Sequence, residues 1–347
     1  MERFSVAVSG DFKKSDGSLS FPEFDLSSLL EHQRVELVYL KDESPIGADQ
    51  LQQVDALILL GNEINSDSFT PGGRVSLIAR FGVGYDNVDV AACTANDCAL
   101  VITPDGVRRP VAVSILTLLF ALTGKLMIKD RIARRGPDGW AEKTHHNGLG
   151  LVGRTLGSVG MGNIGEELFR LAQPFGMTFI AHDPYADPGH AAQLGVELVE
   201  LDDVFRRADF VSINCPLTES TRHLVNRARL HLMKLDAYLI NTSRGPLVDQ
   251  SALTQVLRSG RIAGAGLDVL ETEPPEADDP ILTLDNVIIT PHALCWTDQL
   301  FQGNGRADVV AVMKVISGEV PTGIVNREIL RSPVWVGRLA GYRARFA

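Results

Sequence analysis

The sequence has few cysteines and no excess of positive charge, and each shortage excludes a class of protein. Four cysteines occur among 347 residues, and no two are spaced as a Cys-x-x-Cys pair. That number is too small for a disulfide framework, and the spacing indicates no metal site. The formal net charge is -10, which disfavours nucleic acid as the main partner because phosphate groups are bound by basic patches.

Long hydrophobic runs are absent too. The longest uncharged apolar run, 111–124, is shorter than the roughly 20 residues that a membrane-spanning helix needs, so it predicts a buried helix. Met1 is followed almost directly by an apolar segment, with no basic leader. We therefore expect a cytoplasmic protein without a membrane partner. A cluster of arginines near the C-terminus predicts a solvated or partly ordered tail: Arg331, Arg338, Arg343 and Arg345.

The sequence does contain an alternation of short β-branched runs with helix-like segments. This alternation is typical of α/β folds with parallel sheets, and the length suggests two domains. The first set of runs is Phe4–Ser9, Val35–Leu40, Val54–Leu60, Val75–Phe81 and Leu100–Thr103. The second set is Thr155–Val159, Thr178–Ala181, Phe210–Asn214, Ala237–Asn241, Ile262–Leu267 and Val287–Thr290. We predict two doubly wound parallel-sheet units, with an irregular polar stretch at 134–150 between them.

A glycine-rich motif follows the first strand of the second set. Gly160-Met161-Gly162-Asn163-Ile164-Gly165 stands between a predicted strand and a helix predicted over Ile164–Phe175, which is the context of a dinucleotide-binding turn. The first glycine makes the tight turn, the second admits the pyrophosphate, and the third lets helix and strand pack closely. The helix N-terminus then faces the phosphates. The alternative is a glycine-rich packing turn without a ligand.

An aspartate follows the next strand of this unit. Asp183 lies 23 residues after Gly160, close to the spacing of about 20 residues expected for the carboxylate that binds the ribose hydroxyls. Such a carboxylate repels a 2′-phosphate, and no arginine follows it directly. The sequence therefore favours NAD over NADP as the cofactor, the alternative for Asp183 being a helix cap.

Three polar residues come after later strands of the same unit. Arg244, Glu273 and His292 follow the fourth, fifth and sixth runs of the second set, and the carboxyl ends of parallel strands line one crevice. Reduction of a 2-keto acid needs a planar cation for the carboxylate, a proton donor near neutral pH, and a carboxylate that orients this donor. Each residue alone has an ordinary structural explanation, but their joint position behind a dinucleotide motif predicts catalysis.

Several blocks of the sequence resemble the D-isomer-specific 2-hydroxyacid dehydrogenase family, and the resemblance covers nearly the whole chain. The segment 80–89 resembles the substrate-carboxylate loop of that family. Cys215-Pro216-Leu217-Thr218 with Thr221 resembles its cofactor-contacting turn. Three further blocks resemble its signatures: Asn241-Thr242-Ser243-Arg244-Gly245, Asp268 through Pro274, and Pro291-His292.

The resemblance implies a division of labour between two domains. A flavodoxin-like substrate domain would comprise residues 1–106 and 298–347, with a Rossmann NAD-binding domain, residues 107–297, inserted into it. Val83 and Gly84 would offer backbone amides to the substrate carboxylate. Relatives are usually homodimers joined through the cofactor domain, which would bury the helix at 111–124. Further cofactor contacts are implied for Cys215, Pro216, Thr221, Thr242 and Asp268.

The sequence also departs from the family pattern. An acid often stands early in the apolar helix, where this chain has Ala112-Val113. Phosphoglycerate dehydrogenases carry a basic residue after the third strand, where this chain reads Gly61-Asn62-Glu63. The missing base disfavours phosphoglycerate as the substrate. Oxidation of phosphoglycerate or phosphite on the same scaffold stays an alternative, as does an NAD-sensing, corepressor-like regulator.

Two further features have competing explanations. Arg108 and Arg109 lie near the predicted hinge, where they either bind a second acidic group of the substrate or form ordinary ion pairs. Cys295 lies close to His292, but no hydrolase-like arrangement surrounds it, so we expect a packed side chain rather than a nucleophile.

Overall fold

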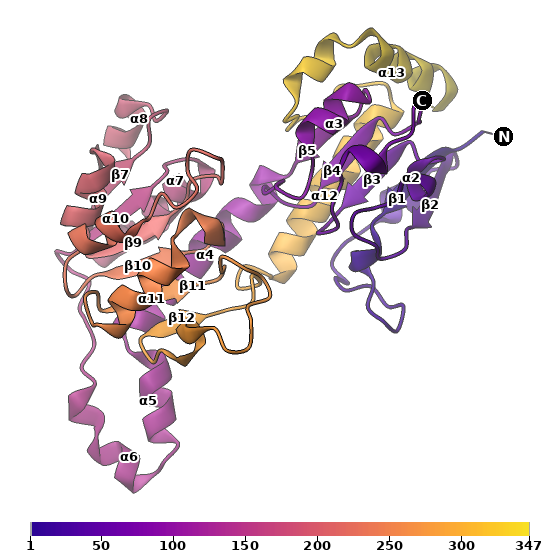
Figure 1. Ribbon diagram of the computed structural model, residues 1–347. Helices are drawn as coiled ribbons and strands as arrows, with labels where there is room; N and C mark the ends of the chain where they lie inside the picture. Colours follow the sequence, from indigo (N-terminus) through magenta and orange to yellow (C-terminus); the bar gives the residue numbers. More distant parts are fainter. Residues whose placement is uncertain (1, 347) are drawn as a thin grey trace. The chain divides into compact units, whose positions relative to one another are not determined.

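The computed structural model describes residues 2–346, which form two compact units (Figure 1). One unit contains the chain up to Val107 and from Trp296 onward, and the other contains Arg108–Cys295. The family resemblance implies borders after residues 106 and 297. The structure places the first border one residue later and the second two residues earlier.

The first unit is built on a five-stranded parallel sheet of order β2-β1-β3-β4-β5. This is the flavodoxin-like order, as the family resemblance implies. Its strands are β1 (Phe4–Val8), β2 (Val35–Tyr39), β3 (Ala56–Leu59), β4 (Leu77–Arg80) and β5 (Ala99–Ile102). Its helices are α1 (Ser27–Leu30), α2 (Ala48–Leu51), α3 (Val90–Ala95), α12 (Asp298–Ile316) and α13 (Pro333–Phe346).

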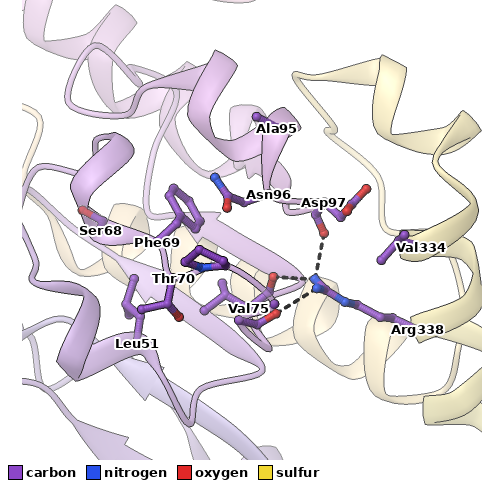
Figure 2. A pocket seen from close by; sticks show the side chains of 13 residues that line it. Leu51, Ser68, Phe69, Thr70, Val75, Ala95, Asn96, Asp97, Val334 and Arg338 are labelled. Atoms are coloured by element: carbon purple, nitrogen blue, oxygen red, sulfur yellow. Dashed lines mark hydrogen bonds between the residues drawn. The ribbon is translucent and has the colours of Figure 1, made fainter.

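The C-terminal segment is an ordered helix, so the prediction of a solvated or partly ordered tail was wrong. Trp335 of α13 is completely buried, and its indole N–H donates to the Ser76 carbonyl at 2.9 Å. Arg338 donates to three backbone carbonyls at the start of the sheet, those of Gly73, Val75 and Asp97 (Figure 2). The cluster of arginines does not predict this docking, because the partners of Arg338 lie about 240 or more residues away in sequence.

Arg338 also lines a pocket of about 500 Å³ between α13 and the loops that precede β4 and β5 (Figure 2). The lining is mostly apolar, with Leu51, Phe69, Val75 and Val334 among its residues. Since the guanidinium is already hydrogen-bonded to backbone carbonyls, it serves to fasten the helix.

The second unit contains a seven-stranded parallel sheet of order β12-β11-β10-β9-β6-β7-β8. This is the Rossmann order with one added edge strand. Its strands are β6 (Thr155–Val159), β7 (Thr178–His182), β8 (Val196–Leu198), β9 (Phe210–Ile213), β10 (Tyr238–Asn241), β11 (Gly264–Leu267) and β12 (Val287–Ile289). Its helices are α7 (Asn163–Ala172), α8 (Pro188–Gln193), α9 (Leu201–Arg207), α10 (Arg227–Leu232) and α11 (Gln250–Arg258). β8, a three-residue edge strand, was not predicted from the sequence.

The apolar helix is longer than its uncharged run. α4 spans Pro104–Thr123, which is long and apolar enough by length and composition to cross a membrane, but more than half of that window is buried inside the protein. Leu118 and Leu122 lie against Gly266 of β11, where a Cβ would be 3.0 Å from Leu118. α4 is therefore a core helix of this unit, as the sequence predicts.

The stretch after α4 is more regular than the sequence suggests. α5 (Leu126–Ala133) and α6 (Pro137–Ala141) form an arm that extends away from the seven-stranded sheet (Figure 1). The prediction of an irregular stretch at 134–150 was wrong where α6 lies. Three large apolar side chains of the arm are more than half exposed: Leu126, Met127 and Trp140.

Candidate active site

The turn from β6 to α7 needs each of its glycines for a different reason. Gly160 has φ +98°, and a Cβ there would lie 2.8 Å from the backbone of Asn214. A Cβ on Gly165 would lie 2.7 Å from the Gly160 carbonyl oxygen, so this glycine lets α7 pack against the turn. A Cβ on Gly162 would meet open space, as expected where a pyrophosphate approaches the backbone. Asn163 and Ile164 open α7, whose first N–H groups favour an anion.

Asp183 directs its carboxylate back toward this turn from the end of β7. Its Oδ2 atom accepts a hydrogen bond from the Met161 amide at 2.8 Å, and its Oδ1 atom accepts one from the Tyr185 amide at 2.9 Å. Negative charge is thereby fixed beside the glycine-rich turn, where it repels the 2′-phosphate of NADP.

The loop after β9 lies next to the glycine-rich turn because β9 pairs with β6. These two strands form the switch point of the sheet, where Rossmann folds bind dinucleotides. Thr221 shapes the loop, since its hydroxyl donates to the Pro216 carbonyl at 2.8 Å. Burial raises the pKa of the Cys215 thiol to about 11, so this side chain is a neutral part of the wall. The buried Thr242 hydroxyl has no hydrogen-bond partner within residues 2–346.

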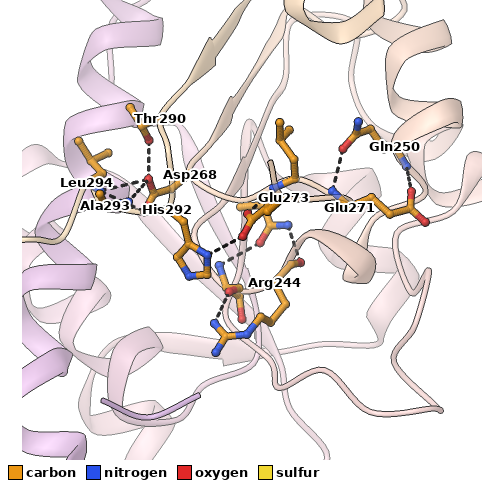
Figure 3. Close-up of polar contacts among 12 residues, drawn as sticks. Arg244, Gln250, Asp268, Glu271, Glu273, Thr290, His292, Ala293 and Leu294 are labelled. Atoms are coloured by element: carbon orange, nitrogen blue, oxygen red, sulfur yellow. Dashed lines mark hydrogen bonds and ion pairs between the residues drawn. The ribbon is translucent and has the colours of Figure 1, made fainter. Parts of the chain in front are cut away.

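The predicted catalytic pair is present. His292 follows β12, Glu273 follows β11, and His292 Nδ1 lies 2.8 Å from Glu273 Oε2 (Figure 3). The other carboxylate oxygen of Glu273 accepts the Leu270 amide at 2.8 Å. Both side chains remain partly exposed, His292 at 44% and Glu273 at 38%, so the pair is accessible to a substrate.

Arg244 lies near this pair and affects its electrostatics. Burial raises the pKa of Glu273, but hydrogen bonds from His292 and the Leu270 amide, together with the charges of His292 and Arg244, outweigh it and leave that pKa lowered. The side-chain amide of Asn241 fixes the Arg244 backbone, since its Nδ2 donates to the Arg244 carbonyl at 2.9 Å. The arrangement thus combines a cation, a proton carrier and an ionised carboxylate.

Asp268 has a structural role that sequence reasoning missed. Its carboxylate is buried, and Oδ1 accepts hydrogen bonds from the Thr290 hydroxyl at 2.6 Å and from the Ala293 and Leu294 amides at 3.1 Å (Figure 3). The Asp268 carbonyl also accepts the His292 amide at 2.8 Å. Asp268 therefore holds the turn that carries His292. A threonine two residues before the histidine was the available sequence signal.

Val83 and Gly84 lie in the first unit, just after β4. The preceding Gly82 has φ +130° and is fixed to Thr103, whose hydroxyl accepts the Gly82 amide at 2.8 Å and whose amide donates to the Gly82 carbonyl at 2.9 Å. This bonding leaves the Val83 and Gly84 amides at the carboxyl edge of the five-stranded sheet, the edge where α/β folds bind ligands.

Two competing explanations from the sequence can now be separated. Arg109 forms an ion pair with Glu167 of α7 at 2.7 Å, so the ordinary ion pair is correct for this arginine. Burial raises the pKa of the Cys295 thiol to about 11, which supports a packed side chain rather than a nucleophile. Across residues 2–346, no group of three His, Cys, Asp or Glu side chains is placed to hold a metal ion.

Comparison with known proteins identifies the family. The description "D-isomer specific 2-hydroxyacid dehydrogenase, NAD binding domain" matches residues 116–293. A glyoxylate reductase of Korarchaeum cryptofilum is 38% identical over 320 residues, covering 89% of this chain and 95% of that protein. The chain belongs to the D-isomer specific 2-hydroxyacid dehydrogenase family.

Other members of the dehydrogenase family are similar over most of this chain. A D-3-phosphoglycerate dehydrogenase of Methanocaldococcus jannaschii is 37% identical over 280 residues, which cover 80% of this chain and 53% of that protein. The crystal structure of a glyoxylate reductase from Paecilomyes thermophila aligns with a TM-score of 0.80 and 28% identity, covering 94% of this chain and all of that one. The predictions of an α/β fold, of an NAD-dependent oxidoreductase of 2-hydroxy and 2-keto acids, and of NAD as cofactor are confirmed.

The residues of the dehydrogenase's second unit fit NAD on structural grounds. The open position at Gly162 leaves room for the pyrophosphate, and the Asp183 carboxylate lies beside the turn, where it can accept hydrogen bonds from the ribose hydroxyls. The unpartnered buried hydroxyl of Thr242 gives a further polar contact at the end of β10.

Proposed function

We propose that this dehydrogenase interconverts a small 2-keto acid of the glyoxylate and hydroxypyruvate class and the corresponding 2-hydroxy acid. The observation that carries the proposal is the 2.8 Å contact between His292 Nδ1 and Glu273 Oε2, with Arg244 close enough to influence Glu273. The substrate class is supported by the relatives that are glyoxylate reductases.

The proposed mechanism assigns one task to each side chain. NADH supplies the hydride when it is bound along Gly160–Gly165, Asp183 and the neighbouring loops. Arg244 binds the substrate carboxylate and carbonyl with its planar guanidinium. Glu273 holds the proton on His292 Nδ1, so that Nε2 delivers its proton to the carbonyl oxygen in reduction and accepts it in oxidation.

The alternatives from the sequence are less well supported. A phosphate near the loop after β3 would meet carboxylates, because the Gly61 and Asn62 amides donate to Asp11 and the Asn62 side chain donates to Asp42. This disfavours phosphoglycerate. The complete set of Arg244, Glu273 and His292 favours an enzyme over an NAD-sensing regulator. No observation on residues 2–346 specifically favours phosphite as the substrate.

The direct test follows NADH oxidation with a panel of 2-keto acids. Glyoxylate, hydroxypyruvate, phenylpyruvate, 2-ketoglutarate and phosphohydroxypyruvate would be compared, with NADPH as the cofactor control. We expect the fastest turnover with glyoxylate or hydroxypyruvate. His292→Ala should lower kcat by about 10²- to 10⁴-fold, the usual contribution of a general acid, without weakening NADH binding measured by fluorescence. Equal turnover in wild type and variant would refute the assignment of His292.

We further propose a cytoplasmic homodimer joined through the NAD-binding unit, without a nucleic-acid or membrane partner. Support comes from apolar side chains that this unit leaves exposed along α4 and the α5–α6 arm. Val113 and Phe120 lie on the outer side of α4, and the arm adds Leu126, Met127 and Trp140. Several large apolar side chains exposed on neighbouring elements of one unit support a protein interface there.

A further inference from the structure

A second histidine–carboxylate pair shares the loop that carries Glu273. His223 Nε2 lies 2.6 Å from Glu271 Oε1, and Glu271 precedes Glu273 by two residues. The mechanism proposed above uses neither His223 nor Glu271. Both side chains are partly exposed, at 41% and 29%. Surface pairs of this kind usually contribute little to stability, so a functional role has to be argued from the further contacts of the two residues.

Glu271 is bound to more than His223. Its amide donates to Gln250 Oε1 at 2.8 Å, and its Oε2 atom accepts the Gln250 amide at 3.2 Å. Gln250 in turn donates from Nε2 to Asp279 at 2.7 Å. Glu271 thereby connects the loop after β11 to the first residue of α11. Its contact with His223 also connects the loop after β11 to the loop after β9.

His223 is itself fixed in an uncommon conformation. Its φ is +51°, in the left-handed region that few residues other than glycine adopt. Its amide donates to the Pro246 carbonyl at 2.8 Å, two residues beyond Arg244. The conformation therefore couples the loop of His223 to the turn that carries Arg244, while the imidazole reaches Glu271.

The Arg244 turn and the Glu273 loop are packed without spare space. A Cβ on Gly245 would lie 1.7 Å from the Leu270 carbonyl oxygen and 2.5 Å from the Glu271 nitrogen. The Leu270 amide donates to Glu273 Oε1. A displacement of Glu271 would therefore move Leu270, and with it the group that orients Glu273 toward His292.

We infer that His223 and Glu271 are positioning residues for the reaction. The contact between them holds the loop of Glu273 against the turn of Arg244, so that Glu273 meets His292 and Arg244 stays in place. The pair acts through these residues rather than on the substrate. This inference rests on the proposed function of Arg244, Glu273 and His292.

The test uses two variants that break the pair with little change in shape. Asn tolerates positive φ but is too short to reach Glu271, so His223→Asn removes the contact and keeps the backbone. Glu271→Gln removes the charge. We expect both variants to lose about tenfold in kcat for 2-keto acid reduction, as misplacement of catalytic groups does, while the Kd for NADH changes less than twofold. His223→Gln, whose amide nitrogen can replace Nε2, should restore most of the activity.

A matched control separates positioning from loss of any surface ion pair. His190 lies 3.0 Å from Glu166 in the same unit, and its side chain is 41% exposed, like that of His223. His190→Asn should leave kcat and the pH profile unchanged. The inference is overturned if His223→Asn and Glu271→Gln affect kcat no more than His190→Asn does.

A second readout does not depend on turnover. Hydrogen–deuterium exchange of a peptide covering 268–276 reports how firmly the loop is held. We expect faster exchange in Glu271→Gln and His223→Asn than in wild type or His190→Asn. If wild-type enzyme shows no His292-dependent reduction, the proposed function fails, and exchange alone decides the positioning inference: unchanged exchange refutes it.

Discussion

At the scale of single residues, two histidines of the second unit share an unusual backbone. His292 and His223 have φ of +54° and +51°, a conformation that costs on the order of 1 kcal/mol or more for a residue with a side chain. Each is paired with a carboxylate of the loop that follows β11. Backbone strain persists only where surrounding contacts fix it, and here those contacts direct both imidazoles toward that loop.

The pH dependence of reduction should change when Glu273 loses its charge. Hydrogen bonds and nearby positive charge outweigh burial and keep the pKa of Glu273 lowered, so its carboxylate favours protonated His292. Reduction needs that proton and declines as it is lost at higher pH. In Glu273→Gln the decline should therefore begin at lower pH, with kcat measured between pH 5 and 9. A profile that coincides with the wild type would contradict the pairing.

The lowered pKa of Glu273 also affects the stability of the fold, at acidic pH. A carboxyl whose pKa is lower in the folded state stabilises the fold above its unfolded-state pKa, and this contribution is lost as pH falls through the lowered folded value. The stability difference between wild type and Glu273→Gln should accordingly shrink in acid. Since Glu273 is more than one third exposed, solvent screening keeps this effect small.

At the scale of elements, the docking of α13 is the feature most open to test. Trp335 is fully buried and donates to the Ser76 carbonyl, while Tyr342 packs edge-on against Phe4 of β1 with ring centroids 5.0 Å apart. Trp335→Ala should lower the free energy of unfolding by about 3–5 kcal/mol, measured by urea denaturation. The neighbouring Val336 is 49% exposed, so Val336→Ala should change stability by less than about 0.5 kcal/mol. Equal effects would show that α13 does not contribute as described.

The strands could be predicted from the sequence because a buried parallel strand is a short run of Val, Ile, Leu and Ala. Such a run is a local pattern. α6 was missed for a local reason as well. It is a five-residue helix that begins at Pro137 and contains Gly139, and such composition favours turns. A Cβ on Gly139 would lie 1.9 Å from the Ile132 carbonyl oxygen, so close packing onto α5 makes the helix possible.

At the scale of the whole molecule, the proposed homodimer can be tested by size. The chain has a mass of 37.7 kDa. Analytical ultracentrifugation of the wild-type protein should give a molecular mass of twice that value. Leu126 and Met127 are 57% and 53% exposed on the α5–α6 arm, and aspartate at both positions should give a monomer. Leu235→Asp, at a side chain 69% exposed in the same unit, serves as the control and should remain dimeric. A monomeric wild type, or a dimeric arm variant, would refute the proposal.

The sequence by itself determined the parts whose chemistry is local. The turn at Gly160–Gly165 and the carboxylate of Asp183 depend on residues within one β–α–β unit, and Arg244, Glu273 and His292 each follow a recognisable strand. The tertiary structure decided which of these groups meet. The contacts of Asp268 with the turn of His292, of His223 with Glu271, and of Arg338 with the carbonyls before β4 and β5 join residues 22 to 265 positions apart. A linear pattern shows that a carboxylate follows a strand, but only the packing of neighbouring loops selects its partner.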